Sequence, residues 1–111
     1  MEEIDFSFRI FVECELEKDE LIDQLHSNLP EAKFSRRAIE FGNNLIQVEN
    51  NDLYNKGERD LDKFWRNFRY EIYSYPMTTT TISEQKSLMD KIVFLIGKMG
   101  FDCRSVSEFD L

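Results

Sequence analysis

The sequence is short of the residues that metal sites, disulfide scaffolds and membrane spans require. It has one histidine, His26, and two cysteines, Cys14 and Cys103, which lie far apart and form no Cys-x-x-Cys motif. A single histidine without neighbouring cysteines cannot supply a zinc site. The apolar run from Ile92 to Gly97 is too short to cross a membrane. We therefore expect no metal, no cofactor and no membrane association.

The start of the chain also lacks the features of a secretory signal. It reads MEEID, with no basic residue ahead of an apolar stretch. Without such a signal, we expect a cytoplasmic protein in which both cysteines are reduced thiols, and a disulfide between them is the alternative. Cys14 falls on the core side of a predicted strand, which favours an inert thiol over a nucleophile.

No catalytic motif is present. His26 has no nucleophile signalled beside it, and the segment NNDLYNKGERD does not match an EF-hand loop. With 22 acidic residues, carboxylate pairs such as Asp60 and Asp62 arise by chance. We therefore expect a binding protein and not an enzyme. At 111 residues and 41% hydrophobic, the chain is expected to form a single domain, residues 1–111, with its own core.

Apolar periodicity predicts the first two elements. Alternation with a period of two from Ile4 to Cys14 predicts a half-buried strand. The segment that follows predicts a helix, which Pro30 ends. Its apolar face comprises Leu21, Ile22, Leu25 and Leu29.

The middle of the chain predicts three strands. Residues 32–41 and 45–50 flank the turn residues Gly42-Asn43-Asn44, which favours a hairpin. A short helical turn is expected at residues 61–65. Residues 68–75 then predict a strand. Its core side is expected to carry Phe68, Tyr70 and Ile72, and its other side Arg69, Glu71, Tyr73 and Tyr75.

A second helix is predicted from an N-cap at Ser83 to Met99, with Gly100 at its end, and a last strand over residues 101–107. The apolar face of this helix is expected to comprise Leu88, Met89, Ile92, Leu95, Ile96 and Met99. The resulting order, β-α-β-β-β-α-β, resembles a ferredoxin-like α+β sandwich with an extra strand. That likeness implies a mainly antiparallel sheet with two helices on one face and a partly open opposite face.

The segment LDKFWRNFRYEIYSYP combines six aromatic rings with two arginines. Such a mixture can form a base-stacking platform or a core. A pI near 4.6 argues against direct nucleic-acid binding. We expect Phe64 and Trp65 to close one end of the core, and Tyr73 and Tyr75 to form part of a protein-contact face.

The negative charge is confined to one part of the chain. Residues 1–32 hold ten acids and two bases, whereas the rest is balanced, so the net charge of −8 arises entirely in the first third. One interpretation is a solvated surface that keeps the protein soluble; the other is a surface that attracts a basic protein. The candidate contacts are Glu13, Glu15, Glu17, Asp19, Glu20 and Asp23.

Phe94 points away from the apolar stripe of the second predicted helix. This position has two possible explanations. In the first, the C-terminal residues Phe109 and Leu111 fold back and cover Phe94. In the second, Phe94 is an exposed anchor for a partner or a second copy.

In size, acidity and α/β pattern, ending in GFDCRSVSEFDL, the chain resembles the small immunity proteins of bacterial contact-dependent growth inhibition and related polymorphic toxin systems. The resemblance implies a monomer or weak dimer that neutralises a cognate toxin, often a basic nuclease domain, by covering its active site. These proteins share no common motif, so no residue role is carried over. The alternative function is a dimeric small-ligand-binding regulatory module of ferredoxin-like fold.

Overall fold

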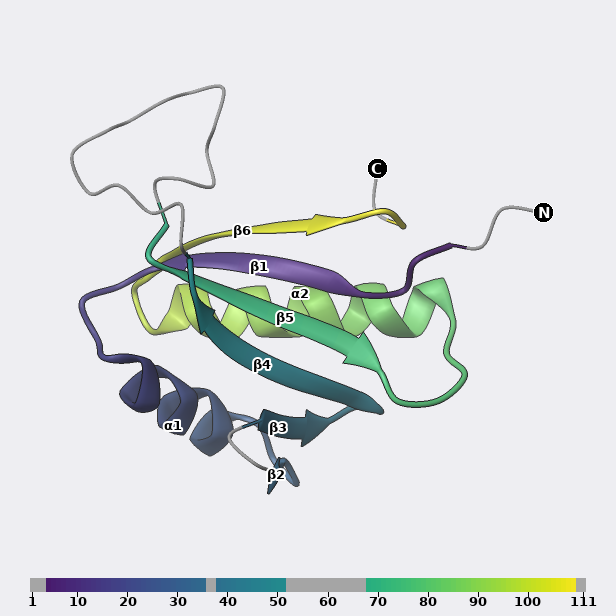
Figure 1. The fold of residues 1–111 in the computed structure, drawn as a ribbon, viewed down its shortest axis with the longest axis horizontal. Helices are drawn as coiled ribbons and strands as arrows, with labels where there is room; N and C mark the ends of the chain where they lie inside the picture. Colours follow the sequence, from purple (N-terminus) through teal and green to yellow (C-terminus); the bar gives the residue numbers. More distant parts are fainter. Residues whose placement is uncertain (1–3, 36–37, 52–67, 110–111) are drawn as a thin grey trace.

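The computed structural model of the protein describes residues 4–35, 38–51 and 68–109 (Figure 1). Three predictions lie outside these residues: the helical turn at 61–65, the closing of the core by Phe64 and Trp65, and the folding of Leu111 over Phe94. The described elements are β1 (Phe8–Glu13), α1 (Lys18–Asn28), β2 (Lys33–Ser35), β3 (Ala38–Phe41), β4 (Asn44–Asn50), β5 (Tyr70–Pro76), α2 (Ile82–Lys98) and β6 (Asp102–Ser107).

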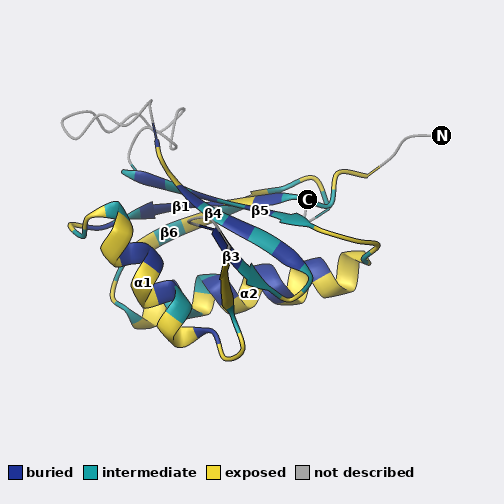
Figure 2. Ribbon diagram, turned by 60° about the horizontal axis from the view of Figure 1, so that its bottom comes forward, coloured by how far each residue is buried: buried dark blue, intermediate teal, exposed yellow. Residues whose placement is uncertain are grey.

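The strands form one six-stranded sheet in the order β2-β3-β4-β5-β1-β6. All neighbouring strands are antiparallel, which confirms the predicted α+β class and antiparallel sheet. Both helices lie on the same side of the sheet, and their buried faces turn toward it (Figure 2). The opposite side, which we call the open face, carries the alternate residues of each strand.

The single strand predicted over residues 32–41 is wrong, because that segment forms two strands. β2 and β3 pair antiparallel, with Phe34 opposite Ile39 and Ser35 opposite Ala38. The sequence between these two strands contains no glycine, proline or asparagine, so it gave no turn signal. The prediction of the next hairpin is confirmed. Gly42 and Asn43 connect β3 to β4 with φ of 58° and 60°, as a type I′ turn requires.

β1 is shorter than the predicted strand from Ile4 to Cys14. The backbone N–H of Ser7 donates to Asp5 Oδ1 at 2.9 Å, and this local turn precedes the strand. β1 begins at Phe8, which pairs with Ser107 at the end of β6. Ile4 lies before the strand, and it is exposed and not part of the core.

β5 also starts later than predicted, at Tyr70. Phe68 does not share the core face with Tyr70 and Ile72, because its ring lies 6.3 Å from that of Phe11 on the open side. Arg69 does not join Tyr73 on the open face. Its guanidinium reaches back to the chain between β1 and α1, where backbone carbonyls accept its hydrogen bonds.

The two helices pack their apolar faces on the sheet as predicted. Leu21, Ile22 and Leu25 of α1 are buried, and so are Leu88, Met89, Ile92 and Ile96 of α2. The predicted N-cap Ser83 is wrong: Thr81 is the cap, and its Oγ1 accepts from the backbone N–H of Glu84 at 3.1 Å. Gly100 follows the helix with φ of 86°, as predicted for a glycine at the end.

A polar cluster that the sequence did not reveal lies within the core. Asn44, Ser74 and Gln85 come from β4, β5 and α2, and each is at most 1% exposed. Gln85 Nε2 also donates to the backbone carbonyl of Phe6 at 2.7 Å, which ties the residues before β1 to α2. Such buried groups are tolerated because they satisfy one another.

Candidate functional site

The predicted acidic residues gather where β1 leads into α1. Glu13 ends β1, Glu15 lies in the connection, and Glu17 is the N-cap of α1. Asp19, Glu20 and Asp23 follow within α1. All six side chains are exposed except that of Glu13, which is half-buried. We call this group the acidic surface: Glu13, Glu15, Glu17, Asp19, Glu20 and Asp23.

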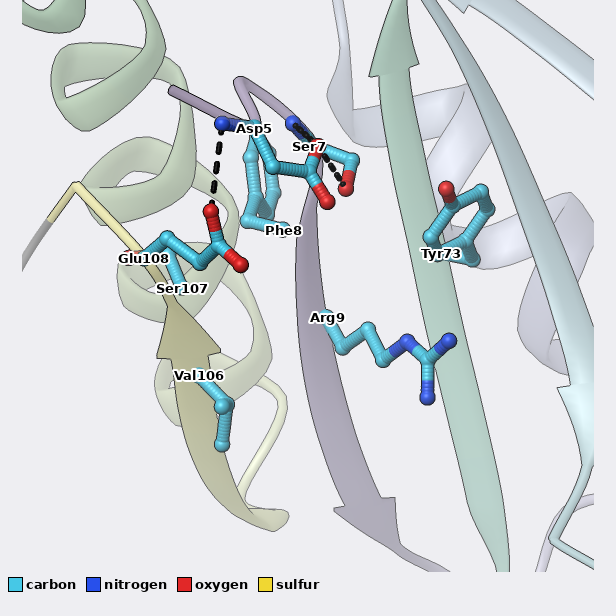
Figure 3. A pocket seen from close by; sticks show the side chains of 8 residues that line it. All are labelled: Asp5, Ser7, Phe8, Arg9, Tyr73, Val106, Ser107 and Glu108. Carbon is cyan, nitrogen blue, oxygen red and sulfur yellow. Dashed lines mark hydrogen bonds between the residues drawn. The ribbon is translucent and has the colours of Figure 1, made fainter. Parts of the chain in front are cut away.

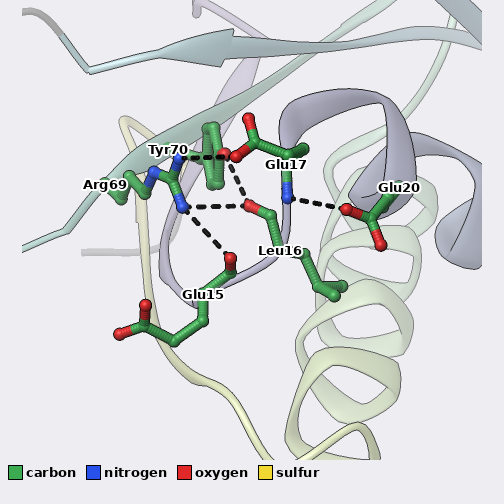
Figure 4. A network of polar contacts seen from close by, with 6 residues as sticks. All are labelled: Glu15, Leu16, Glu17, Glu20, Arg69 and Tyr70. Carbon is green, nitrogen blue, oxygen red and sulfur yellow. Dashed lines mark hydrogen bonds and ion pairs between the residues drawn. The ribbon is translucent and has the colours of Figure 1, made fainter.

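The connection that carries the acidic surface is held by Arg69 and Tyr70 (Figure 4). Arg69 Nη1 donates to the carbonyls of Glu15 at 3.3 Å and Leu16 at 3.1 Å. The Tyr70 hydroxyl donates to the same Leu16 carbonyl at 2.6 Å. Two side chains at the start of β5 therefore fix the backbone between Glu15 and Glu17. We call Arg69 and Tyr70 the loop clamp.

The start of α1 favours negative charge for a local reason. Carboxylates in the first helical turn interact favourably with the helix dipole. The backbone N–H of Glu17 donates to Glu20 Oε1 at 3.4 Å, and Asp19 lies in the same turn. Helix formation thus favours acidic side chains here independently of any partner.

The acidic surface retains a strong excess of negative charge. Between Glu13 and Asp23 the chain holds six acids and one base, Lys18. The loop clamp adds one cation, since Arg69 Nη2 lies 3.7 Å from Glu17 Oε1. Most of the Arg69 hydrogen bonds go to backbone carbonyls and not to the carboxylates, so its charge offsets only part of this excess.

Tyr73 and Tyr75 lie on the open face, as predicted. Their ring centroids are 5.6 Å apart. The Arg9 guanidinium lies 5.4 Å from the Tyr73 ring and its Nε is 3.1 Å from Glu71 Oε1. These residues form a half-exposed strip of aromatic and charged groups across β1 and β5, and its role as a protein-contact face stays a prediction.

Phe94 is 64% exposed on the outward side of α2. Phe109 does not fold over it and instead packs edge-on against Phe8, with ring centroids 6.4 Å apart. Lys98 lies 5.5 Å from the Phe94 ring. The predicted contact residues therefore occupy separate places: the α1 end, the open face, and the outer side of α2. The structure does not bring them together.

The other residues of types that can carry chemistry include His26 and the two cysteines. The His26 ring stacks on Phe34 at 4.0 Å, and its Nε2 lies 2.9 Å from the Ala32 carbonyl oxygen. Both cysteines are free; burial raises the pKa of the Cys14 and Cys103 thiols above the ordinary 9.0. In the described residues no group of three or more histidine, cysteine or acidic side chains is placed to hold a metal ion. None of the described helices is long and apolar enough to cross a membrane.

One hollow on the open face was missed by sequence reasoning. It measures about 320 Å³ and lies over the start of β1 and the end of β6 (Figure 3). Its lining brings together residues distant in sequence: Asp5, Ser7, Phe8, Arg9, Tyr73, Val106, Ser107 and Glu108. Only the pairing of β1 with both β5 and β6 creates this group, so no sequence motif announces it.

Comparison with known proteins gives no relative. No family model, curated protein or solved structure matches the chain.

Proposed function

We propose that this chain binds and neutralises a basic protein, as the immunity proteins that it resembles do with their toxins. The observation that carries the proposal is the acidic surface itself. Six carboxylates lie within one short stretch of chain and are opposed there by a single lysine. The occupant that fits this surface is a cleft lined with lysine and arginine, such as the phosphate-binding cleft of a nuclease.

The mechanism is electrostatic attraction followed by docking on a fixed surface. Opposite charges on two proteins accelerate their encounter, and the acceleration falls as salt screens it. The loop clamp supports this role because it holds the backbone at Glu15 and Leu16 before any partner arrives. A surface that is already ordered loses less conformational entropy on binding.

The relation of the sheet to a ferredoxin-like fold is part of the same proposal. It is supported by the order β4-β5-β1-β6, with α1 after β1 and α2 after β5, because a ferredoxin-like fold also combines four strands and two helices in the sequence β-α-β-β-α-β. The hairpin of β2 and β3 is then an addition at the outer edge of β4. The fold itself supports no particular function, because many functions share it.

The test requires a basic partner and a matched pair of variants. The first partner to examine is the C-terminal domain of a large secreted protein encoded beside the gene for this chain. The test variant carries Glu20→Lys and Asp23→Lys. The control carries Glu49→Lys and Asp90→Lys, which gives the same net charge at exposed positions on β4 and α2.

We expect the native protein to bind one-to-one in calorimetry, and to bind more weakly as salt rises. The test variant should associate about tenfold more slowly at low salt and with a flatter salt dependence. The control should keep most of the native rate. Equal slowing in both variants would show that only net charge matters, and absence of binding to any such basic domain would overturn the proposal.

A further inference from the structure

The hollow on the open face has walls of unlike chemistry. Val106 of β6 and Tyr73 of β5 stand on either side of β1 and provide apolar surface (Figure 3). Arg9 lies between them, because it pairs with Tyr73 on one side and Val106 on the other. Asp5 and Glu108 close the end nearest the start of β1. The volume of about 320 Å³ is at the lower limit of ligand pockets, and is enough for one long side chain.

The two carboxylates are held in place by the chain itself. Asp5 Oδ1 accepts from the Ser7 backbone at 2.9 Å and from the Ser7 hydroxyl at 2.7 Å. Glu108 Oε2 accepts from the Asp5 backbone N–H at 3.2 Å, which joins the two acids across the end of the pocket. The Ser7 hydrogen bonds lower the pKa of Asp5 below the ordinary 3.8, so this carboxylate is ionised at neutral pH.

Arg9, the cation in the pocket lining, already has an ion-pair partner. Arg9 Nε lies 3.1 Å from Glu71 Oε1, and its guanidinium sits over the Tyr73 ring. Glu71 is the less exposed partner of this pair, and its carboxylate offsets the Arg9 charge. The pocket therefore presents two carboxylates at one end and apolar walls along its length, which is the complement of a cation on an aliphatic stem.

We propose that this pocket receives one arginine side chain of the basic partner, a role that rests on the proposed function for the existence of that partner. The guanidinium would lie between Asp5 and Glu108, because a planar fork of donors suits two carboxylates approached from one side. The aliphatic stem would pass along Val106 and Tyr73. The open face then adds an anchored contact to the long-range attraction of the acidic surface.

The pocket can be tested without the partner. The probe is N-acetyl-arginine amide, titrated into the ¹⁵N-labelled full chain while amide shifts are followed by NMR. N-acetyl-citrulline amide has nearly the same shape without the charge. We expect saturable shifts of Ser7, Tyr73 and Val106 with Kd on the order of 1 mM for the arginine probe, and at least fivefold weaker binding of citrulline.

Isosteric variants identify the carboxylates. Asp5→Asn and Glu108→Gln each retain an oxygen that can accept a hydrogen bond from the same backbone N–H, so the local turn should survive. Each should weaken arginine binding at least fivefold. Asp90→Asn removes the same charge from an exposed position on α2 and should leave binding unchanged. Equal affinity for citrulline, shifts centred on α1, or full binding by Asp5→Asn with Glu108→Gln would overturn the proposal.

Measurements with the partner separate the two proposals. Asp5→Asn with Glu108→Gln should accelerate dissociation of the complex and leave association nearly unchanged, whereas Glu20→Lys with Asp23→Lys should slow association. An effect of the α1 variant alone would refute the pocket and retain the proposed function. Probe binding without any basic protein partner would refute the assignment of the arginine to that partner.

Discussion

Asn44 and Gln85 exchange a pair of hydrogen bonds inside the core. Asn44 Nδ2 donates to Gln85 Oε1 at 2.8 Å, and Gln85 Nε2 donates to Asn44 Oδ1 at 3.0 Å. The Ser74 hydroxyl also donates to Asn44 Oδ1, at 3.0 Å. Asn44 is the first residue of β4 and Gln85 belongs to the first turn of α2, so this pair sets where the helix lies along the sheet.

Replacing Asn44 by alanine should destabilise the protein by about 2–3 kcal/mol, because the Gln85 amide and the Ser74 hydroxyl would lose a buried partner. The measurement is urea unfolding followed by circular dichroism. Gln24→Ala on the exposed side of α1 is the matched control and should change the free energy of unfolding by less than about 0.5 kcal/mol. A similar small effect of Asn44→Ala would show that water replaces the lost partner.

Two glycines should respond to alanine with opposite signs. Gly42 has φ of +58°, and a Cβ there would meet Leu88 Cδ1 at 3.3 Å. Gly42→Ala should therefore lower the free energy of unfolding by about 1–2 kcal/mol. Gly97 lies within α2, and a Cβ added to it would meet nothing within 4 Å. Gly97→Ala should stabilise by about 0.5–1 kcal/mol. Thermal denaturation of both variants provides the comparison, and a shift of equal sign would contradict it.

Element types were predictable where a periodic pattern is long. The helix faces at Leu21–Leu25 and Leu88–Ile96 and the Gly42-Asn43 turn follow from local preferences, and all were found. Element ends were less predictable. The division of residues 32–41 into β2 and β3 depends on strand pairing, which no glycine, proline or asparagine within that segment signals.

In the candidate site, too, features set by neighbouring residues were predictable and features set by distant contacts were not. The acidic surface could be located because its residues are adjacent in sequence and α1 keeps them together. The role of Arg69 could not, since alternation along β5 assigned it to the open face. It contacts Glu15 and Leu16 because the strand starts only at Tyr70. The pocket between Asp5 and Glu108 requires contacts over most of the chain length, which a local pattern does not contain.

The protein should lose stability at alkaline pH. Burial raises the pKa of Cys14 and Cys103 above 9.0, and it raises the pKa of Tyr70 above 10.0. The unfolded chain releases these protons at lower pH than the folded chain. Stability is therefore fully present below about pH 8 and falls as pH rises through about 9 and above.

Urea midpoints at about pH 7.5 and 9.5, on either side of that range, measure this effect. We expect a lower midpoint at the higher pH, and a smaller decrease in Cys14→Ala, which lacks one of the three groups. The comparison is made within each variant, so the cost of the cavity left by the substitution cancels. An equal decrease in the variant would show that the Cys14 thiol does not contribute to the pH dependence.

The loop clamp should behave as a coupled pair. Arg69 and Tyr70 donate to the same Leu16 carbonyl, so either can satisfy it when the other is removed. Arg69→Met and Tyr70→Phe should each lower the free energy of unfolding by about 1 kcal/mol, and the double variant should lower it by about 0.5 kcal/mol more than the sum of the two.

Tyr75→Phe on the open face is the control for the cycle, since its effect and that of Arg69→Met should be additive. Chemical unfolding of these variants and the native chain measures the coupling. Strict additivity of Arg69→Met with Tyr70→Phe would mean that water already satisfies the Leu16 carbonyl, and that the connection bearing the acidic surface is held by other contacts.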